Sequence, residues 1–303
     1  MNLVTFFRLV RWKNLLLITY VFFLIKFLLF PSLNTVTNLN ILQFLLLWIS
    51  ILFITASGYI FNDIKDIETD KINKPASPIV AKKITIKIAK QWYFYLNSFG
   101  IIIGILFSFI IKKPIVSLIF IGTSLLLNWY SVCLKSKPFV GNFLISFLAA
   151  FSFVLLAILD INYHPKTLNQ TVTILIIYGL GALAFFINLI REIVKDIEDV
   201  KGDNILNMKT LPIILGIKRS RKIAVVISSI PLLFLLFIVA NLDTYYIWLN
   251  LYLIITCILP LLYISIKLWK IKSYKKMKEI STILKIIMFL GINSIIIISI
   301  IEN

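Results

Sequence analysis

The sequence predicts an all-α, polytopic membrane protein with nine transmembrane helices. Of its 303 residues, 60% are hydrophobic, and the mean hydropathy of +0.99 is far above that of a soluble domain. The apolar residues gather in runs close to the length of about 20 residues that a helix needs to cross a bilayer. These runs lack the alternation of polar and apolar residues that the strands of a membrane β-barrel require. We therefore expect one helical membrane domain over residues 1–303.

The basic residues predict how the nine runs are oriented. The runs cover residues 14–33, 41–61, 91–111, 114–133, 139–159, 171–190, 223–241, 245–266 and 283–301. With a cytoplasmic N-terminus, the segments on that side hold 27 of the 31 Lys and Arg residues, which satisfies the positive-inside rule. After nine crossings the C-terminus is then outside. Lys26 lies inside the first run, where it either snorkels toward the interface or contacts a partner.

The formal net charge of +18 is therefore first a topology signal, and it also favours contact with anionic lipid headgroups. It does not predict nucleic-acid binding, because no basic soluble domain is present to carry that function. Cys133 and Cys257 lie far apart, in or beside the runs, so we expect neither a disulfide nor a cysteine metal site. His164 is the only histidine and cannot build a histidine-based metal site alone.

Acidic residues gather in two short stretches of this basic chain. Residues 61–75 read FNDIKDIETDKINKP and residues 191–203 read REIVKDIEDVKGD, and together they hold nine of the thirteen acids. Their aspartates repeat with a spacing of three and then four, at Asp63, Asp66 and Asp70 and again at Asp196, Asp199 and Asp203. Positions i, i+3 and i+7 share one face of a helix, so we expect each stretch to present three carboxylates along one stripe.

Both acidic stretches are expected on the cytoplasmic side, because the first follows the second run and the other follows the sixth. This arrangement predicts two related halves. Like charges at helical spacing repel one another. Mg²⁺ would relieve that repulsion, since it binds carboxylate oxygens and leaves positions open for substrate phosphates. The alternative is two solvated charged segments paired with nearby lysines. The matched spacing, side and place in the chain favour the metal site.

Three segments of the chain resemble motifs of the UbiA superfamily of intramembrane prenyltransferases. They are NDIKDIETD followed by INKP, REIVKDIEDVKGD followed by KTLP, and YSVCLKSKPFVGN after the fourth run. The resemblance covers most of the chain and implies a helical bundle around a central cavity. It also implies that Mg²⁺ on the aspartates holds the diphosphate of an isoprenyl donor. The prenyl group is then transferred to an acceptor within the membrane, and diphosphate is released.

The resemblance implies roles for individual residues. The metal ligands would be Asn62, Asp63, Asp66, Asp70, Asp196, Asp199 and Asp203, with Asp66, Asp70, Asp199 and Asp203 central to catalysis. The substrate contacts would be Arg11, Asn14, Lys74, Tyr130, Lys135, Arg191 and Glu192. The chain departs from the family at Ser77, where arginine is common. Either Lys74 supplies that charge or the contact is missing.

The second acidic motif most resembles the branch of the family that prenylates geranylgeranylglyceryl phosphate during ether-lipid synthesis. The leading hypothesis is therefore transfer of a geranylgeranyl group to the hydroxyl of that lipid. The alternative acceptor is an aromatic quinone precursor such as 4-hydroxybenzoate. A secondary transporter is a less favoured class, because the acids cluster at span ends on one side instead of lying within the spans. A metal sensor or scaffold would explain the acids but not the nine spans.

Overall fold

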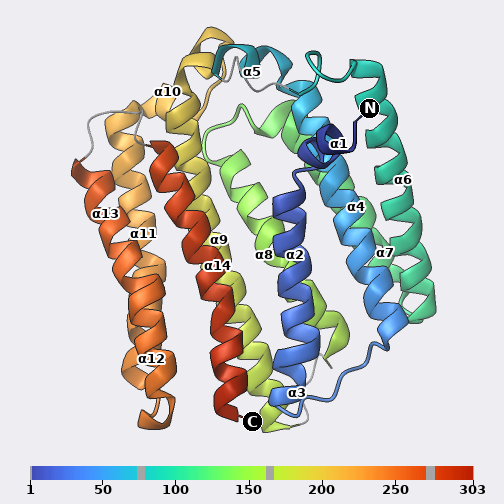
Figure 1. Ribbon diagram of the computed structural model, residues 1–303. Coiled ribbons are helices and arrows are strands. Elements are labelled where there is room, and N and C mark those ends of the chain that lie inside the picture. The colour runs from blue at the N-terminus through green and yellow to red at the C-terminus, as the bar shows by residue number, and fades with distance from the viewer. Residues whose placement is uncertain (1, 74–78, 162–166, 271–276, 303) are drawn as a thin grey trace. The chain divides into compact units, whose positions relative to one another are not determined.

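The computed structural model describes residues 2–73, 79–161, 167–270 and 277–302 (Figure 1). Over these residues the chain is helical and contains no strand. Nine helical segments in the described part are long and apolar enough to cross a membrane. The prediction of an all-α, nine-span membrane protein is thus confirmed.

The nine segments follow the predicted order and mostly extend beyond the predicted runs. The first is α2 (Trp12–Leu24), a π-helical turn and α3 (Phe30–Ser32), and the fourth is α7 (Ser117–Trp129) with a turn on either side of it. The eighth is a 3-10 turn (Thr244–Tyr246), α12 (Ile247–Leu253), a π-helical turn and α13 (Leu259–Lys270). The others are α4 (Ile41–Lys65), α6 (Ile86–Ile110), α8 (Val140–Asp160), α9 (Leu168–Ile205), α11 (Ile217–Asn241) and α14 (Met277–Glu302). Three shorter helices accompany them: α1 (Leu3–Leu9), α5 (Ile67–Asn73) and α10 (Leu211–Leu215).

Local sequence fixes where several of these helices begin. Asn40 and Gln43 form a capping box at the start of α4, in which each side chain accepts a hydrogen bond from the other residue's backbone N–H. Thr85 caps α6 by accepting from the N–H of Ile88. These caps satisfy backbone donors that a helix N-terminus otherwise leaves without partners.

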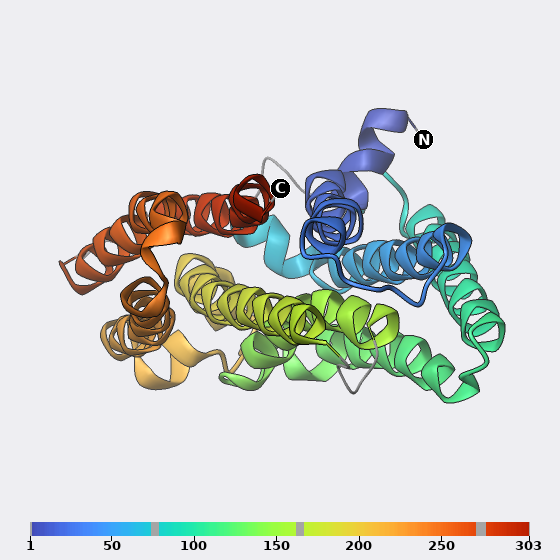
Figure 2. The same ribbon diagram turned by 90° about the horizontal axis from the view of Figure 1, so that it is seen from below.

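The described residues divide into two compact units, each assembled from separate stretches of the chain. The first comprises Met1–Phe22, Asn38–Ser136 and Lys201–Asn207. Within it, α4 and α6 lie side by side (Figure 1 and Figure 2). A Cβ added at Gly104 of α6 would lie 2.8 Å from the hydroxyl oxygen of Ser50 on α4, and Ser50 donates to the carbonyl of Gly100 at 2.7 Å. Small residues therefore let these membrane helices approach closely.

The second unit comprises Phe23–Thr37, Lys137–Val200 and Met208–Asn303. Here α11 packs on α13, and the hydroxyls of Ser228 and Ser265 are 2.7 Å apart. The same unit contains an ion pair inside the spans: Lys26 donates to Asp160 at 2.7 Å, and both side chains are buried. Lys26 therefore does not reach for the membrane surface, and its charge is balanced within the protein.

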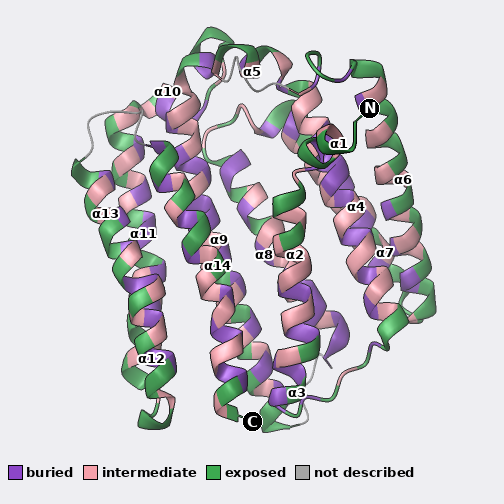
Figure 3. Cartoon of the chain, viewed as in Figure 1, coloured by how far each residue is buried: buried purple, intermediate pink, exposed green. Residues whose placement is uncertain are grey.

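Exposed apolar side chains cover the outer face of several spans (Figure 3). On α6, the exposed residues Phe99, Ile102, Leu106 and Phe109 follow one another at intervals of three or four. Residues at that spacing share one helix face. A continuous apolar face of this kind is suited to lipid, because water would solvate it poorly.

Candidate functional site

The first acidic motif is divided between two helices. Asp63 lies on α4, which ends at Lys65, and Asp70 lies on α5, which begins at Ile67. Between them Asp66 has φ −89° and ψ 5°, outside the regular helical range. The predicted stripe of three carboxylates on one continuous helix is therefore wrong for this motif.

The side chain of Asp66 makes two contacts at this break. Its carboxylate accepts a hydrogen bond from the amide of Asn62 at 2.6 Å and forms an ion pair with Lys135. Lys135 comes from the end of the fourth span, 69 residues away in sequence. Aspartate is a weak helix former, so the helical conformation is easily interrupted at this position.

A second cation neutralises the neighbouring carboxylate. Arg11 donates to Asp63 at 2.6 Å, and its guanidinium lies 4.8 Å from the centre of the Tyr59 ring. Burial by itself lowers the pKa of Arg11, but attraction to Asp63 and Tyr59 outweighs it and holds that pKa above its ordinary value. Arg11 is therefore a permanent positive charge beside the first motif.

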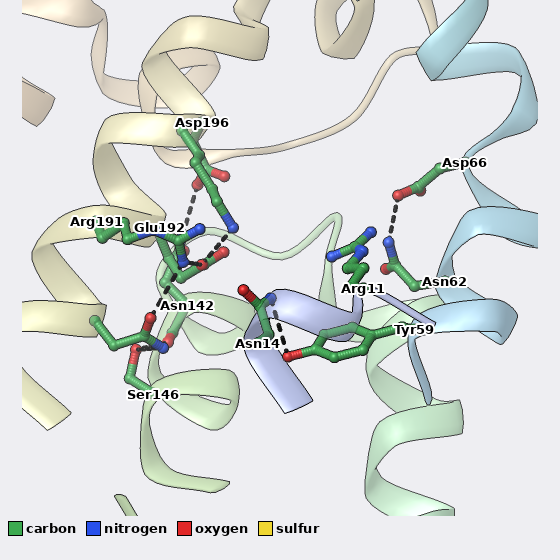
Figure 4. Close-up of polar contacts among 12 residues, drawn as sticks. Arg11, Asn14, Tyr59, Asn62, Asp66, Asn142, Ser146, Arg191, Glu192 and Asp196 are labelled. Carbon is green, nitrogen blue, oxygen red and sulfur yellow. Dashed lines mark hydrogen bonds and ion pairs between the residues drawn. The ribbon is translucent and has the colours of Figure 1, made fainter. Parts of the chain in front are cut away.

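Arg11 occupies a backbone turn that few residues adopt. Its φ of 52° lies in the left-handed region, between α1 and α2. A side chain with a Cβ is held there at a cost of about 1 kcal/mol, which the contacts with Asp63 and Tyr59 offset. Asn14, one turn further on, donates to the Tyr59 hydroxyl at 3.3 Å (Figure 4). Both predicted residues at the mouth of the first span thus lie beside the first acidic motif.

One buried oxygen in this cluster lacks a partner. The Oδ1 atom of Asn62 is inaccessible to solvent and makes no hydrogen bond among the described residues. Unpaired buried acceptors are rare in proteins, and they often mark a missing ligand or ion. An amide oxygen next to a carboxylate is a donor set that Mg²⁺ accepts.

The described residues contain no group of three or more His, Cys, Asp or Glu side chains close enough to hold a metal ion by themselves. This agrees with the usual binding of Mg²⁺, which takes one or two carboxylates and completes its shell with water and substrate phosphates. The donors around Asn62 and Asp66 therefore fit a Mg²⁺ ion that binds together with a phosphorylated substrate.

The second acidic motif lies on one unbroken helix. The helix α9 runs from Leu168 to Ile205, well past the predicted run that ended at residue 190. Asp196, Asp199 and Asp203 therefore share a helical face, as the spacing predicted. Asn142, at the start of α8, donates from its amide to Asp196 at 2.8 Å (Figure 4).

A buried charge network precedes the second motif on α9. Glu192 accepts from Arg191 at 3.0 Å and from Lys195 at 2.6 Å, and Arg191 also donates to Asn188 at 3.3 Å. Side-chain exposure is only 12% for Arg191 and 11% for Glu192. The two residues predicted to contact substrate are thus paired with each other, and two cations neutralise the one carboxylate.

The last turn of α9 belongs to the first compact unit and meets α5 there. The backbone N–H of Gly202 donates to Asn73 at 2.9 Å, across 129 residues of sequence. This contact brings the end of the second motif, Asp203, into the same unit as Asp70. Asp203 is buried.

The structure assigns the remaining predicted residues as follows. Tyr130 begins the π-helical turn that ends at Leu134, and its carbonyl accepts from the N–H of Lys135 at 2.9 Å. Asp199 lies between Asp196 and Asp203 on α9. Lys74 lies outside the described residues, as does Ser77. The roles predicted for the site residues remain predictions.

Sequence reasoning missed several residues of these clusters, namely Tyr59, Asn73, Asn142, Asn188, Lys195 and Gly202. Asn142 carried a weak signal, because it is the last residue of the segment YSVCLKSKPFVGN that resembles a family motif. Asn73 and Gly202 stand next to predicted residues, but nothing in their spacing indicates that they touch. Asn188 is a lone amide in an apolar run.

A family comparison decides the relationship of the chain. The model of the UbiA prenyltransferase family matches residues 15–292. The chain belongs to the UbiA prenyltransferase family. The match covers both acidic motifs and Lys135. Arg11 and Asn14, at the mouth of the first span, lie just before its first residue.

Curated members of the UbiA family similar to the chain are digeranylgeranylglyceryl phosphate synthases. The one from Saccharolobus solfataricus is 37% identical over 182 residues, which is 59% of either protein. The one from Methanosphaera stadtmanae is 32% identical over 242 residues, covering 78% of this chain and 80% of the relative. The chain spans about three fifths of the length of the first two relatives that it matches.

Solved structures of the UbiA family share the fold. A structure described as digeranylgeranylglyceryl phosphate synthase in membranes superposes with a TM-score of 0.66 at 26% identity, over 98% of both chains. A UbiA homolog from Archaeoglobus fulgidus, bound to DMAPP and Mg²⁺, superposes with a TM-score of 0.57 at 16% identity, over 96% of this chain and 99% of the homolog. At this identity the second likeness supports the fold alone.

Proposed function

We propose that the chain is a Mg²⁺-dependent prenyltransferase that moves a geranylgeranyl group from its diphosphate to the hydroxyl of geranylgeranylglyceryl phosphate. The observation that carries the proposal is the cluster around Asp66, where a carboxylate, a buried amide oxygen without a partner and a lysine meet. Family membership and the names of the similar synthases support it.

The residues of the first motif have distinct parts in the proposed reaction. Asp66 and Asn62 would hold Mg²⁺, which when bound neutralises the diphosphate and makes it a better leaving group. Lys135 already lies beside Asp66 and would donate to the same diphosphate as its negative charge develops. Arg11 adds a positive charge that does not vary with pH.

The second motif would supply the remaining carboxylates. Asp196 accepts a hydrogen bond from Asn142, so its carboxylate is oriented before any ligand binds. Asp199 and Asp203 follow on the same face of α9. We propose that Asp203 serves the magnesium site with Asp63 and Asp70 of the same compact unit, and that Asp196 and Asp199 also bind Mg²⁺.

Bond changes in the proposed transfer balance without a further reactant. The allylic C–O bond of the donor breaks, and diphosphate leaves with the electron pair. The acceptor hydroxyl oxygen forms the new C–O bond and loses its proton, either to a motif carboxylate or to the departing diphosphate. Water would capture the cationic carbon, and apolar membrane spans exclude it.

The placement of the site in the cell is part of the proposal. The chain is a multi-pass membrane protein of the UbiA family. The distribution of Lys and Arg supports a cytoplasmic N-terminus, a cytoplasmic active site and a C-terminus on the opposite side. We also propose one prenyltransferase domain over residues 1–303, since a single family match runs from 15 to 292.

A product assay tests the proposed reaction. Membranes containing the protein receive radiolabelled geranylgeranyl diphosphate and Mg²⁺, with geranylgeranylglyceryl phosphate or 4-hydroxybenzoate in separate reactions. We expect label in a digeranylgeranyl glyceryl lipid and none without Mg²⁺. Label on the aromatic ring alone would keep the reaction class and refute the lipid acceptor. No transfer to either acceptor would refute the proposal as stated.

A further inference from the structure

A hydrogen bond joins the ends of the two acidic motifs. Asn73 is the last residue of α5, one turn after Asp70, and Gly202 directly precedes Asp203 on α9. The side-chain oxygen of Asn73 accepts from the Gly202 N–H at 2.9 Å. Both ends belong to the first compact unit, so this contact lies within one described body of the protein.

A glycine is needed at position 202 because Asn73 packs closely against it, and not because of the backbone conformation there. It lies in the last turns of α9, and among the described residues Gly216 is the glycine with a positive φ. Glycine weakens a helix relative to alanine, so its presence there needs another reason. A Cβ at position 202 would lie 2.5 Å from the Asn73 amide nitrogen and 2.7 Å from its Cγ, closer than real contacts allow. The missing side chain makes room for Asn73.

We propose that Asn73 and Gly202 are positioning residues that fix the separation of Asp70 and Asp203 for metal binding. The inference rests on the proposed function, in which both aspartates serve the magnesium site. Mg²⁺ tolerates little deviation from octahedral geometry with ligand distances of about 2.0–2.1 Å. A carboxylate on α5 and one on α9 can meet that demand only if the two helix ends are held together, and the Asn73–Gly202 bond does this.

The inference predicts a specific effect on metal affinity. Loss of an outer contact that orients a ligand commonly weakens metal binding about 10- to 100-fold. Gly202→Ala and Asn73→Ala should therefore each raise the Kd for Mn²⁺, used as a spectroscopic substitute for Mg²⁺, by about tenfold or more. The matched control is Gly122→Ala, because a Cβ at this helical glycine meets nothing within 4 Å.

A reversible crosslink separates positioning from general stability. Asn73→Cys and Gly202→Cys are combined in a chain whose own cysteines are removed by Cys133→Ser and Cys257→Ala. The close approach at position 202 places the two new Cβ atoms within the range of a disulfide. Crosslinking is read by mass spectrometry of peptides, and Mn²⁺ binding is read by electron paramagnetic resonance with and without geranylgeranyl diphosphate.

We expect the crosslink to form, the reduced protein to bind Mn²⁺ about tenfold more weakly than its parent, and oxidation to restore the affinity to within about threefold. Failure to crosslink, or equal affinity in the reduced and oxidised forms, would overturn the inference. If the parent transfers no prenyl group, but the Mn²⁺ affinity of the double-cysteine protein changes when the crosslink forms, the proposed function is wrong and the positioning role stands. If the protein transfers the prenyl group normally and its Mn²⁺ affinity is the same in the reduced and oxidised forms, the proposed function stands and the positioning role is refuted.

Discussion

The two acidic motifs have the same spacing of aspartates but are built in different ways. In the first motif, the helix breaks at Asp66, and two cations from distant parts of the chain, Arg11 and Lys135, pair with Asp63 and Asp66. In the second motif α9 runs on without a break, and the cations beside Glu192 are its neighbours on the same helix. The spacing of charged residues therefore fixes neither the shape of a motif nor the source of its counter-charges.

This difference suggests a division of labour within the proposed reaction. Lys135 and Arg11 come from segments outside the first motif. Each can therefore contact a diphosphate as well as the aspartate that it pairs with. In the second motif, Arg191 and Lys195 both pair with Glu192, their neighbour on the same helix. The first motif should therefore govern the leaving group, and the second should govern the rigidity of the metal site.

The largest expected effect comes from removing one aspartate of either motif. Asp66→Ala and Asp199→Ala should each lower prenyl transfer by about 10²–10³-fold or more. Each change removes a proposed ligand of the Mg²⁺ ion that stabilises the leaving diphosphate. The rate of label transfer from geranylgeranyl diphosphate at saturating Mg²⁺ measures this loss. Size-exclusion profiles in detergent should match those of the parent protein. Full activity in either variant would refute the metal assignment.

The next effect separates the lysines of the two motifs. Lys135→Ala should lower kcat/KM by about 10²-fold, because Lys135 pairs with Asp66 at the proposed magnesium site and is proposed to donate to the diphosphate there. Lys195→Ala, in the second motif, removes a cation that contacts Glu192 and should lower it only a few-fold. Equal losses in steady-state kinetics would remove the functional distinction between the motifs.

The glutamates of the two motifs give a comparison in stability. Glu192→Gln leaves Arg191 and Lys195 without their shared carboxylate in a buried position and should destabilise the fold by about 2–3 kcal/mol. Glu68→Gln removes an exposed pair with Lys71, worth at most about 0.5 kcal/mol. Denaturant unfolding in detergent, followed by tryptophan fluorescence, measures both. A stable Glu192→Gln protein would show that the buried network is dispensable.

A smaller effect tests whether Asn142 orients Asp196. Asn142→Ala should raise the Mg²⁺ concentration for half-maximal transfer by about tenfold, with little change in kcat at saturating Mg²⁺. Asn169→Ala, on the second unit but away from the acidic motifs, is the matched control. A fall in kcat that excess Mg²⁺ does not reverse would contradict the orienting role.

The spans were predictable from the sequence because a bilayer imposes one demand on every crossing segment. The backbone must satisfy its own hydrogen bonds, so each apolar run of sufficient length becomes a helix. The stripe on α9 followed from the spacing of Asp196, Asp199 and Asp203, since nothing interrupts that helix. The same reasoning failed at Asp66, where α4 ends and α5 begins and where the carboxylate pairs with a lysine 69 residues away.

The contacts of single amides could not have been predicted. Asn142 meets Asp196 across 54 residues, and Asn73 meets Gly202 across 129 residues. Hydropathy and spacing carry no information about such pairs, because one amide is compatible with many partners. The short helix α1 was also missed, since its seven residues are too few to show a clear periodicity.

The buried pair of Lys26 and Asp160 has a consequence for how the protein is made. A lone charge at the centre of a span costs about 2.5–3.5 kcal/mol on insertion, and pairing relieves that cost. Lys26 emerges from the ribosome 134 residues before Asp160 is available to it. We therefore expect the first span to reach its final position in the membrane only after the fifth span has been made.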